Sequence, residues 1–305
     1  MKTIKILLLI LFLLSSGTRV VYAGPGSSAA SFLRIGVGAK PAAMGDAYVG
    51  VSGDILSLYS NPAGLCSLYG NELSFSHAVW VESINYSNAT LGIPLLEGYM
   101  ALGISGLYMD DIDKFSRYGD PVGESYRPSD IAVTAGYSRF IGGVSAGAAL
   151  KYITSDIDGY RANAVALDIG AMRYFGMLNA GVSVQNIGTK MKFRERGESL
   201  PMTVRAGVSY PFFVSGAHIL ATAEASYSED IPFRINAGCN AELAIGRTRL
   251  SLRMGVKSYA EGLDTLSHFT TGLGVQIGDI VFDYALVPYE DLGLTHRVSV
   301  RFLID

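Results

Sequence analysis

The chain has 305 residues, of which 49% are hydrophobic and only 17% are charged. Soluble domains carry about 25% charged residues, so this composition disfavours an ordinary soluble protein. The net charge of −3 disfavours a nucleic-acid-binding protein, which would present a basic face.

A bilayer-spanning helix takes about 20 apolar residues, and no such run follows residue 14. A large soluble β protein and a transmembrane β-barrel therefore remain. The 36 glycines and 18 tyrosines favour the barrel, because glycine serves tight turns and curved sheets and tyrosine suits membrane interfaces.

Residues 1–23 have the organisation of a secretory signal peptide. Lys2 and Lys5 provide the positive amino-terminal part, residues 6–14 are all apolar, and Ala23 precedes the expected cut at Gly24. The alternative, an uncleaved membrane anchor, is disfavoured because the apolar run is too short to span a bilayer. No cysteine follows the cut, so a lipoprotein is not expected.

Residues 24–71 do not alternate like strands, and we predict that they form a plug, gate or docking surface at or inside the periplasmic mouth of a barrel. Glycines in the first half permit close backbone approach to a wall. Residues 54–59 fit a short helix, with Ser52 or Asp54 as its cap and Pro62 after its end. Residues 47–51 either add a strand to the wall or run through the lumen. The candidate plug or gate residues are Gly36, Gly38, Met44, Gly45, Tyr48, Tyr59, Asn61 and Pro62.

From Glu72 onward, apolar and polar residues alternate with period two, which predicts strands. Most of the segments have ten or more residues, as tilted membrane strands do. The fourteen predicted strands are 72–80, 84–93, 98–109, 129–140, 143–155, 162–175, 177–187, 201–212, 217–227, 233–245, 248–258, 268–278, 280–289 and 295–304.

One face of these strands is apolar, and the other combines small and polar residues with isolated charges of both signs. Alternation by itself also fits a soluble antiparallel sheet. A solvent-facing sheet would carry more lysine and glutamate, whereas small residues suit a confined lumen. We therefore expect the apolar faces to meet outer-membrane lipid and the ring to close without exposed edges. The candidate lumen-facing charges are Lys151, Asp168, Arg205, Glu224, Arg234, Glu242, Arg253, Asp283 and Arg301.

The connections between the predicted strands alternate in length. Those after even-numbered strands are short, and those after odd-numbered strands include 110–128, 188–200, 228–232, 259–267 and 290–294, with 81–83 as the exception. Bacterial outer-membrane barrels have short periplasmic turns and longer outer loops. Residues 72–305 are therefore predicted to form an all-β transmembrane antiparallel β-barrel in the bacterial outer membrane. Such barrels usually end in an aromatic residue, whereas this chain ends in Asp305.

Short motifs recur in order along nearly the whole mature chain. They are FLRIGVGA at 32–39, AMGDAYV at 43–49, YSNPAGL at 59–65, ELSFSH at 72–77, LKYI at 150–153, DGY at 158–160, QNIG at 185–188, DYALVPY at 283–289, DLG at 291–293 and THR at 295–297. Their order resembles that of PorV/PorQ-family outer-membrane proteins, which are similar in fold to FadL-type barrels that carry hydrophobic molecules. The chain departs from the family at Ser60, often a large residue such as tryptophan, and at Asp46, usually a glycine.

The resemblance implies a fourteen-stranded barrel without enzymatic activity or cofactor. It also implies a role in protein export or surface attachment of the type IX secretion kind, with secretion-system components or exported cargo as partners. The alternative is a FadL-like channel for a hydrophobic small-molecule ligand. Two features favour it: a lumen face of small residues rich in glycine, and the irregular amino-terminal stretch. An outer-membrane hydrolase is a third hypothesis.

The hydrolase hypothesis depends on residues 143–147, which match the G-x-S-x-G motif around a nucleophilic serine, here Ser145. That motif needs a turn between a strand and a helix, whereas these residues fall within a predicted strand. A barrel could still bring a serine, a histidine and an acid together. The four histidines, at positions 77, 218, 268 and 296, have no metal-ligand spacing.

The remaining candidates are carboxylates, cysteines and aromatic residues. Carboxylates at 110–113 and 156–159 could bind calcium, but they lack the EF-hand spacing, so solvated loop charges are favoured and no metal is predicted. Cys66 and Cys239 are expected to be unpaired, with a disulfide as the alternative for an exported protein.

The aromatic residues Tyr48, Tyr59, Tyr69, Phe75, Trp80 and Tyr86 could line a hydrophobic path or form an interface girdle. We favour the girdle for Trp80 and the plug or ligand path for Tyr48 and Tyr59.

Overall fold

The computed structural model describes residues 28–80, 84–193, 196–258, 268–288 and 293–304. The predicted signal peptide and Gly24 lie outside the described residues. Within these ranges, no helix is long and apolar enough to cross a membrane.

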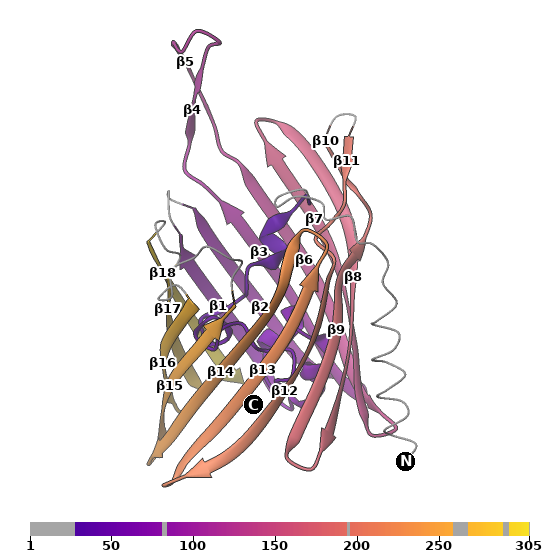
Figure 1. Cartoon of the computed structure of the whole chain (residues 1–305), viewed down its shortest axis with the longest axis vertical. Coiled ribbons are helices and arrows are strands. Elements are labelled where there is room, and N and C mark those ends of the chain that lie inside the picture. The colour runs from indigo at the N-terminus through magenta and orange to yellow at the C-terminus, as the bar shows by residue number, and fades with distance from the viewer. Residues whose placement is uncertain (1–27, 81–83, 194–195, 259–267, 289–292, 305) are drawn as a thin grey trace.

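Fourteen antiparallel strands form a closed barrel (Figure 1). Each strand pairs with its neighbours along the chain, and β1 pairs with β18 to close the ring. The strands are β1 (Asn71–Val79), β2 (Asn85–Leu95), β3 (Gly98–Tyr108), β6 (Ser129–Ile141), β7 (Val144–Ile157), β8 (Tyr160–Phe175), β9 (Leu178–Gly188), β12 (Thr203–Val214), β13 (Ala217–Ser228), β14 (Ile231–Ile245), β15 (Thr248–Lys257), β16 (Phe269–Ile277), β17 (Ile280–Pro288) and β18 (Leu294–Ile304). The predicted fold class is confirmed, and every predicted strand boundary lies within two residues of the observed one.

Two further hairpins extend the connections that the sequence predicted only as loops. The hairpin of β4 (Ile112–Phe115) and β5 (Pro121–Tyr126) projects beyond the barrel (Figure 1). The other consists of β10 (Met191–Phe193) and β11 (Arg196–Glu198).

The prediction of a loop at 228–232 was wrong. β13 ends at Ser228 and β14 begins at Ile231, so the connection is a tight turn. The Asp230 carboxylate stabilises this turn, because it accepts hydrogen bonds from Ser228 Oγ at 3.2 Å and from Arg34 Nη1 at 2.6 Å.

The two ends of the barrel differ. At the short-turn end, two-residue turns join β2–β3, β6–β7, β8–β9, β12–β13, β14–β15 and β16–β17. Gly246 and Gly278 have φ values of 63° and 58° there, in the left-handed region that tight turns need. The opposite, long-loop end carries both hairpins.

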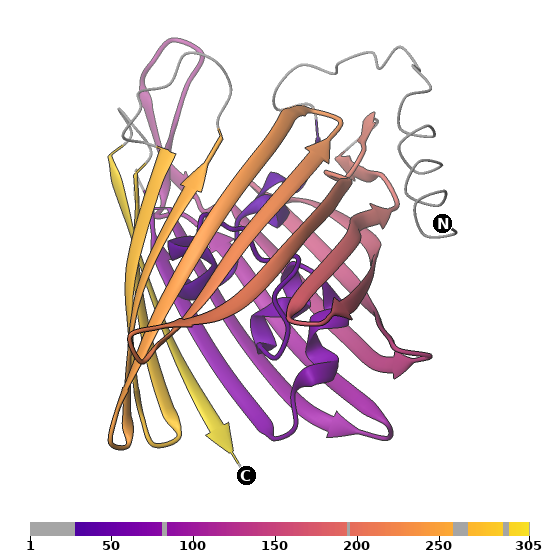
Figure 2. The same ribbon diagram turned by 60° about the horizontal axis from the view of Figure 1, so that its bottom comes forward.

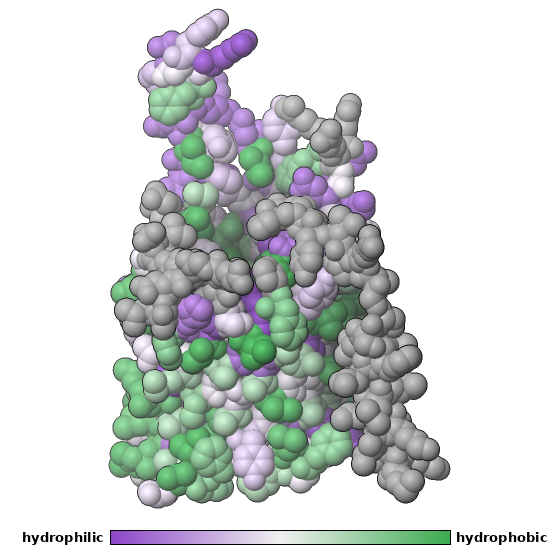
Figure 3. Space-filling model, viewed as in Figure 1, coloured by the Kyte–Doolittle hydropathy of each residue, from purple (hydrophilic) through white to green (hydrophobic). Residues whose placement is uncertain are grey.

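The wall has an apolar outer face and a polar inner face. In β15 the outward Leu250, Leu252, Met254 and Val256 are 41–59% exposed, whereas the inward Ser251, Arg253 and Lys257 are buried. Apolar side chains accordingly gather over the barrel wall in Figure 3, while the tip of the β4–β5 hairpin is mostly hydrophilic. A closed ring with this polarity is the arrangement of a transmembrane barrel.

Residues 28–70 form a plug inside the barrel (Figure 2). The plug contains η1 (Ser31–Arg34), α2 (Ala39–Ala43), η2 (Ile55–Tyr59) and η3 (Pro62–Ser67). η2 begins as predicted, with the Asp54 carboxylate accepting a hydrogen bond from Leu56 N, and Asn61 caps η3 in the same way. Residues 47–51 run through the lumen and add no strand to the wall.

The plug crosses the full depth of the barrel. It begins at the long-loop end, where Ala29 N donates to Ser199 O at 3.0 Å and Arg34 pairs with Asp230 at 2.6 Å. It leaves at the short-turn end, where Gly70 O accepts a hydrogen bond from Tyr99 OH at 2.8 Å. The segment was predicted to lie at or inside the periplasmic mouth; it lies inside the barrel, but these first contacts hold its start at the opposite end.

A lysine on the outer face should destabilise the barrel more, the nearer its position lies to the middle of the membrane. Leu252 lies mid-strand and Ile277 lies beside a short turn. We expect Leu252→Lys to lower the free energy of unfolding in vesicles by about 2–4 kcal/mol and Ile277→Lys by about 0–1 kcal/mol. Urea unfolding, followed by the fluorescence of the single tryptophan, measures both values. Equal losses would contradict a membrane-spanning wall.

Candidate functional site

A belt of glycines on the inner wall receives the plug. Each strand of the belt presents an inward glycine where a Cβ atom would lie no farther than 3.0 Å from an atom of the plug. This glycine belt consists of Gly92, Gly103, Gly136, Gly147, Gly170, Gly181, Gly207, Gly238, Gly255 and Gly272, one from each of ten strands. Any side chain at these positions would have to displace the plug or the wall.

In part of the belt, plug backbone lies directly on wall backbone. Gly238 and Gly255 are cross-strand partners, and the backbone at Met44 and Gly45 covers both. On the other side of the ring, the Pro62–Ala63 backbone covers Gly147. Such an approach requires residues without a Cβ atom, which explains these glycines within strands, where glycine is otherwise unfavourable.

Wall side chains hydrogen-bond the irregular backbone of the plug. The Gly50 carbonyl accepts from Asn179 Nδ2 at 2.8 Å and from Ser209 Oγ at 2.7 Å. Other carbonyls of the plug accept in the same way, namely Ala43 O from Thr270 at 2.9 Å, Tyr59 O from Gln185 at 2.7 Å and Ser60 O from Ser183 at 2.8 Å. Backbone that is neither helix nor strand can lie at membrane depth when it is satisfied inside the protein in this way.

Asp54 is the centre of an ion cluster between plug and wall. Its Oδ2 atom lies 2.8 Å from Lys40 Nζ and 3.2 Å from Arg301 Nη1, and it accepts a hydrogen bond from Tyr48 OH at 2.9 Å. Lys40 and Arg301 thus compensate the charge of the buried carboxylate, and the contact with Arg301 ties the plug to β18.

Two further carboxylates fix the middle of the plug. Asp46 pairs with Lys257 of β15. Glu224 of β13 accepts hydrogen bonds at 2.9 Å from both Tyr48 N and Val49 N, and its other oxygen lies 3.0 Å from Arg205 Nε. The plug is thus held by charges from three separated strands.

All the predicted lumen-facing residues lie on the inner side of their strands, but they form separate groups. The first group contacts the plug or its immediate partners and consists of Arg205, Glu224 and Arg301. The second group, Arg253 and Asp283, extends the Asp54 cluster, with 2.7 Å between Arg253 Nη1 and Asp283 Oδ1. Lys151 and Asp168 pair with each other at 2.7 Å. Glu242 lies 3.7 Å from Arg249 near the short-turn end.

A vestibule separates the start of the plug from the wall at the long-loop end. It consists of two adjoining cavities of about 70 and 240 Å³, which share Arg34, Ile35, Arg205, Ile231 and Arg234. Its lining combines apolar side chains with cations, uncharged polar groups and the Asp46 carboxylate, so it suits a ligand that has both apolar and polar parts.

Trp80 lines this vestibule, so the prediction of an interface girdle was wrong. Its ring lies in the lumen, with Arg297 Cζ 5.9 Å from the ring centroid. Tyr48 and Tyr59 lie in the plug, and of the other aromatic candidates Tyr86 is buried in the lumen while Phe75 is exposed on the outer face.

The other chemical candidates do not form a site. Ser145 is buried in β7, and Gly147, the next inward residue, lies beneath Pro62, so the G-x-S-x-G motif has no strand–turn–helix context. The loop carboxylates pair with cations: Asp111 with Arg127, Asp156 with Arg161 and Asp158 with Lys114. The described residues contain no group of three or more potential metal ligands.

The disulfide alternative was also wrong. Both cysteines are free, and Cys66 is buried in the plug while Cys239 is exposed on the outer face.

No family model and no curated protein matches the chain. Among solved structures, the Ralstonia pickettii toluene transporter TbuX matches 88% of this chain and 99% of its own at 12% identity, with a TM-score of 0.62. The Pseudomonas putida toluene transporter TodX matches 87% of this chain and 96% of its own at 10% identity, with a TM-score of 0.58. The monoaromatic hydrocarbon channel CymD has the same coverage at 11% identity and a TM-score of 0.58. The chain therefore shares its fold with hydrocarbon channels, in agreement with the FadL-like architecture expected from the sequence.

A side chain on the glycine belt should loosen the plug. A Cβ atom at Gly181 would collide with Val49 O, so we expect Gly181→Val to raise the rate of maleimide labelling at buried Cys66 about tenfold, in a Cys239→Ala background. Gly106→Ala is the matched control, because a Cβ atom there would lie 3.9 Å from its nearest neighbour, Asp130 O. Equal rates in the two variants would refute the role of the belt.

Proposed function

We propose that the protein is a non-enzymatic outer-membrane channel for hydrophobic small molecules, in which residues 28–70 form the gate. The observation that carries this proposal is the course of the plug, which crosses the lumen from one mouth to the other and contacts most of the strands. Any molecule that passes through the lumen must displace or rearrange this segment.

The orientation of the barrel makes the vestibule an entry site. Short turns face the periplasm in bacterial outer-membrane barrels, so the long-loop end faces the exterior. Ile35, Trp80 and Ile231 offer apolar surface there, while Arg34 and Arg234 offer hydrogen-bond donors. The vestibule therefore favours hydrophobic ligands that carry a polar or anionic group.

The fold shared with the toluene transporters TbuX and TodX supports a channel. The burial of Ser145 beneath η3 supports a non-enzymatic role. At 10–12% identity the ligand of those proteins does not transfer to this one, so the ligand class is argued from the vestibule.

A role in protein export or surface attachment, as the PorV/PorQ resemblance implies, is the second candidate. The projecting β4–β5 hairpin favours it, because Phe115 and Tyr118 are 63% and 89% exposed beyond the barrel. Exposed aromatic residues outside the membrane suit contact with another protein.

An uptake measurement tests the channel. In a bacterial host with an intact lipopolysaccharide layer, we expect cells that make the wild-type protein to take up radiolabelled toluene or decanoate several times faster than cells with the empty vector. Asp54→Asn should change that rate because it weakens the bond between plug and wall, whereas Asp111→Asn, which affects only a loop ion pair, should not. Uptake equal to the empty vector for both probes would exclude the channel. Altered surface proteins after deletion of the gene would then favour the export role.

A further inference from the structure

The outer face of the wall carries a groove that passage through the lumen does not use. It has a volume of about 530 Å³ and crosses β18, β1, β2, β3 and β6. This volume lies within the range of about 300–1,000 Å³ that is usual for ligand sites.

Small residues make the floor of the groove, and large apolar residues make its sides. Ser87 and Ala89 of β2 and Gly106 of β3 are the floor, and Ser87 and Gly106 are cross-strand partners. Phe75 rises on one side and Ile104 on the other, each opposite Ala89 across a strand pair. The depression therefore results from missing side-chain volume on β2 and β3, not from a break in the wall.

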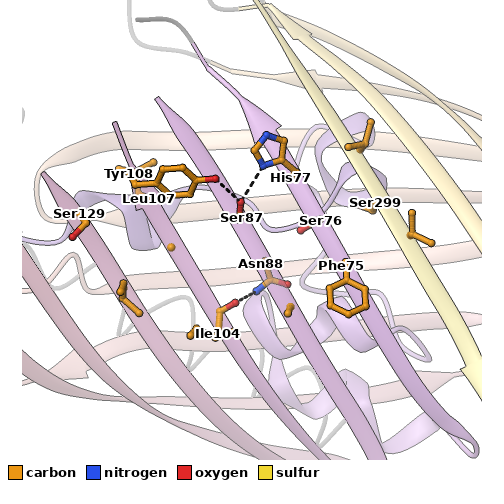
Figure 4. Close-up of a pocket in the computed structure, with 15 residues that line it drawn as sticks. Phe75, Ser76, His77, Ser87, Asn88, Ile104, Leu107, Tyr108, Ser129 and Ser299 are labelled. Carbon is orange, nitrogen blue, oxygen red and sulfur yellow. Dashed lines mark hydrogen bonds between the residues drawn. The ribbon is translucent and has the colours of Figure 1, made fainter. Parts of the chain in front are cut away.

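A chain of polar side chains lies across the end of the groove nearest the long loops (Figure 4). His77 Nδ1 lies 3.0 Å from Ser87 Oγ, which lies 3.3 Å from Tyr108 OH. Among the described residues, His77 Nε2 has no hydrogen-bond partner. His77 and Tyr108 therefore place hydrogen-bonding groups on the outer face at this end of the groove, where an oxygen-bearing partner can reach them.

The order of polarity along the groove matches that of a lipid molecule. On β2 the outward residues change from Ser87 to Ala89 to Leu91 in the direction of the short turns. On β3 the corresponding series is Tyr108, Gly106 and Ile104. Polar groups thus lie towards the exterior and apolar groups towards the middle of the membrane, as in a lipid of the outer leaflet.

The wall behind the groove is closed. β1, β2 and β3 pair without a register shift, and on the inner side Asn88 Nδ2 donates to Ile104 O at 3.0 Å. An occupant can therefore arrive only from the membrane, which separates this groove from the path through the lumen.

We propose that this groove binds one outer-leaflet membrane lipid, with an acyl chain over Ala89 and Gly106 and with the ester or hydroxyl oxygens of the lipid on His77 and Tyr108. The proposal does not depend on the proposed channel, since the site lies on the opposite face of the wall.

Native mass spectrometry of the full-length barrel, supplied with dipalmitoyl phosphatidylethanolamine, tests the site. Gly106→Leu fills the floor, and a Cβ atom at this position meets nothing closer than 3.9 Å in the protein. We expect this variant to retain about tenfold less lipid than the wild type. Ala223→Leu is the matched control, because it adds the same side chain on the exposed outer face of β13, away from the groove, and should retain lipid as the wild type does.

A second variant tests the site without a large added side chain, in case Gly106→Leu fails to fold. Ser87→Val removes the middle of the polar chain with little change in volume, and it too should lower lipid retention if the polar end contributes. Heat-modifiable migration on gels confirms that each barrel has folded. Equal retention by the wild type, Gly106→Leu and Ser87→Val would overturn the proposal. Displacement of the lipid by toluene would also overturn it, because it would assign the groove to a channel substrate.

Discussion

The close approach between plug backbone and wall backbone is the constraint on which the rest of the structure depends. A chain can fill a narrow lumen with irregular backbone only if the wall leaves room and supplies hydrogen-bond partners. Inward glycines such as Gly147 and Gly255 leave the room, and neighbouring inward side chains such as Ser209 and Thr270 provide the partners. Room and partners therefore come from the same inner face, which explains why that face is small and polar.

Ion pairs between plug and wall fix the position of the plug along the lumen. The glycine belt would allow the plug to slide, because backbone contacts and carbonyl acceptors recur along the chain. Asp46, Asp54 and Glu224 each bind a particular position of the plug to a particular strand. Desolvation offsets much of the attraction within buried ion pairs of this kind, so they add little net stability. We interpret the ion pairs as the contacts that set the position of the plug, and the glycine belt as the surface on which the plug packs.

The barrel could be predicted from the sequence because each strand residue faces either lipid or lumen. Apolar and polar residues therefore alternate with period two along each strand, which is a local pattern. The same parity also places Trp80. Trp80 has the inward parity of Ser74 and Ala78, which excludes a lipid-facing girdle position. The belt, too, appears in the sequence as glycines that recur at inward positions of successive strands.

The course of the plug could not be predicted in this way. Its starting point depends on contacts such as Arg34 with Asp230, which are 196 residues apart and follow no local pattern. The tight turn at Asp230 depends on the same contact. The turn at 228–232 and the start of the plug at the long-loop end therefore both follow from a long-range pair that no local pattern indicates.

The distribution of anchors along the plug indicates how a gate could open. Towards the short turns, Pro62 and Ala63 lie against Gly147, and Ser138 donates a hydrogen bond to Ala63 O at 3.1 Å, so this part is held by tight neutral packing. Towards the long loops, η1 borders the vestibule and is tied by Arg34 to Asp230, at a site where its side chain is 19% exposed. Water and an anionic ligand can compete for a partly exposed ion pair far more easily than for buried backbone contacts. The vestibule end of the plug is therefore the end that a ligand would move first, while the short-turn end stays in place.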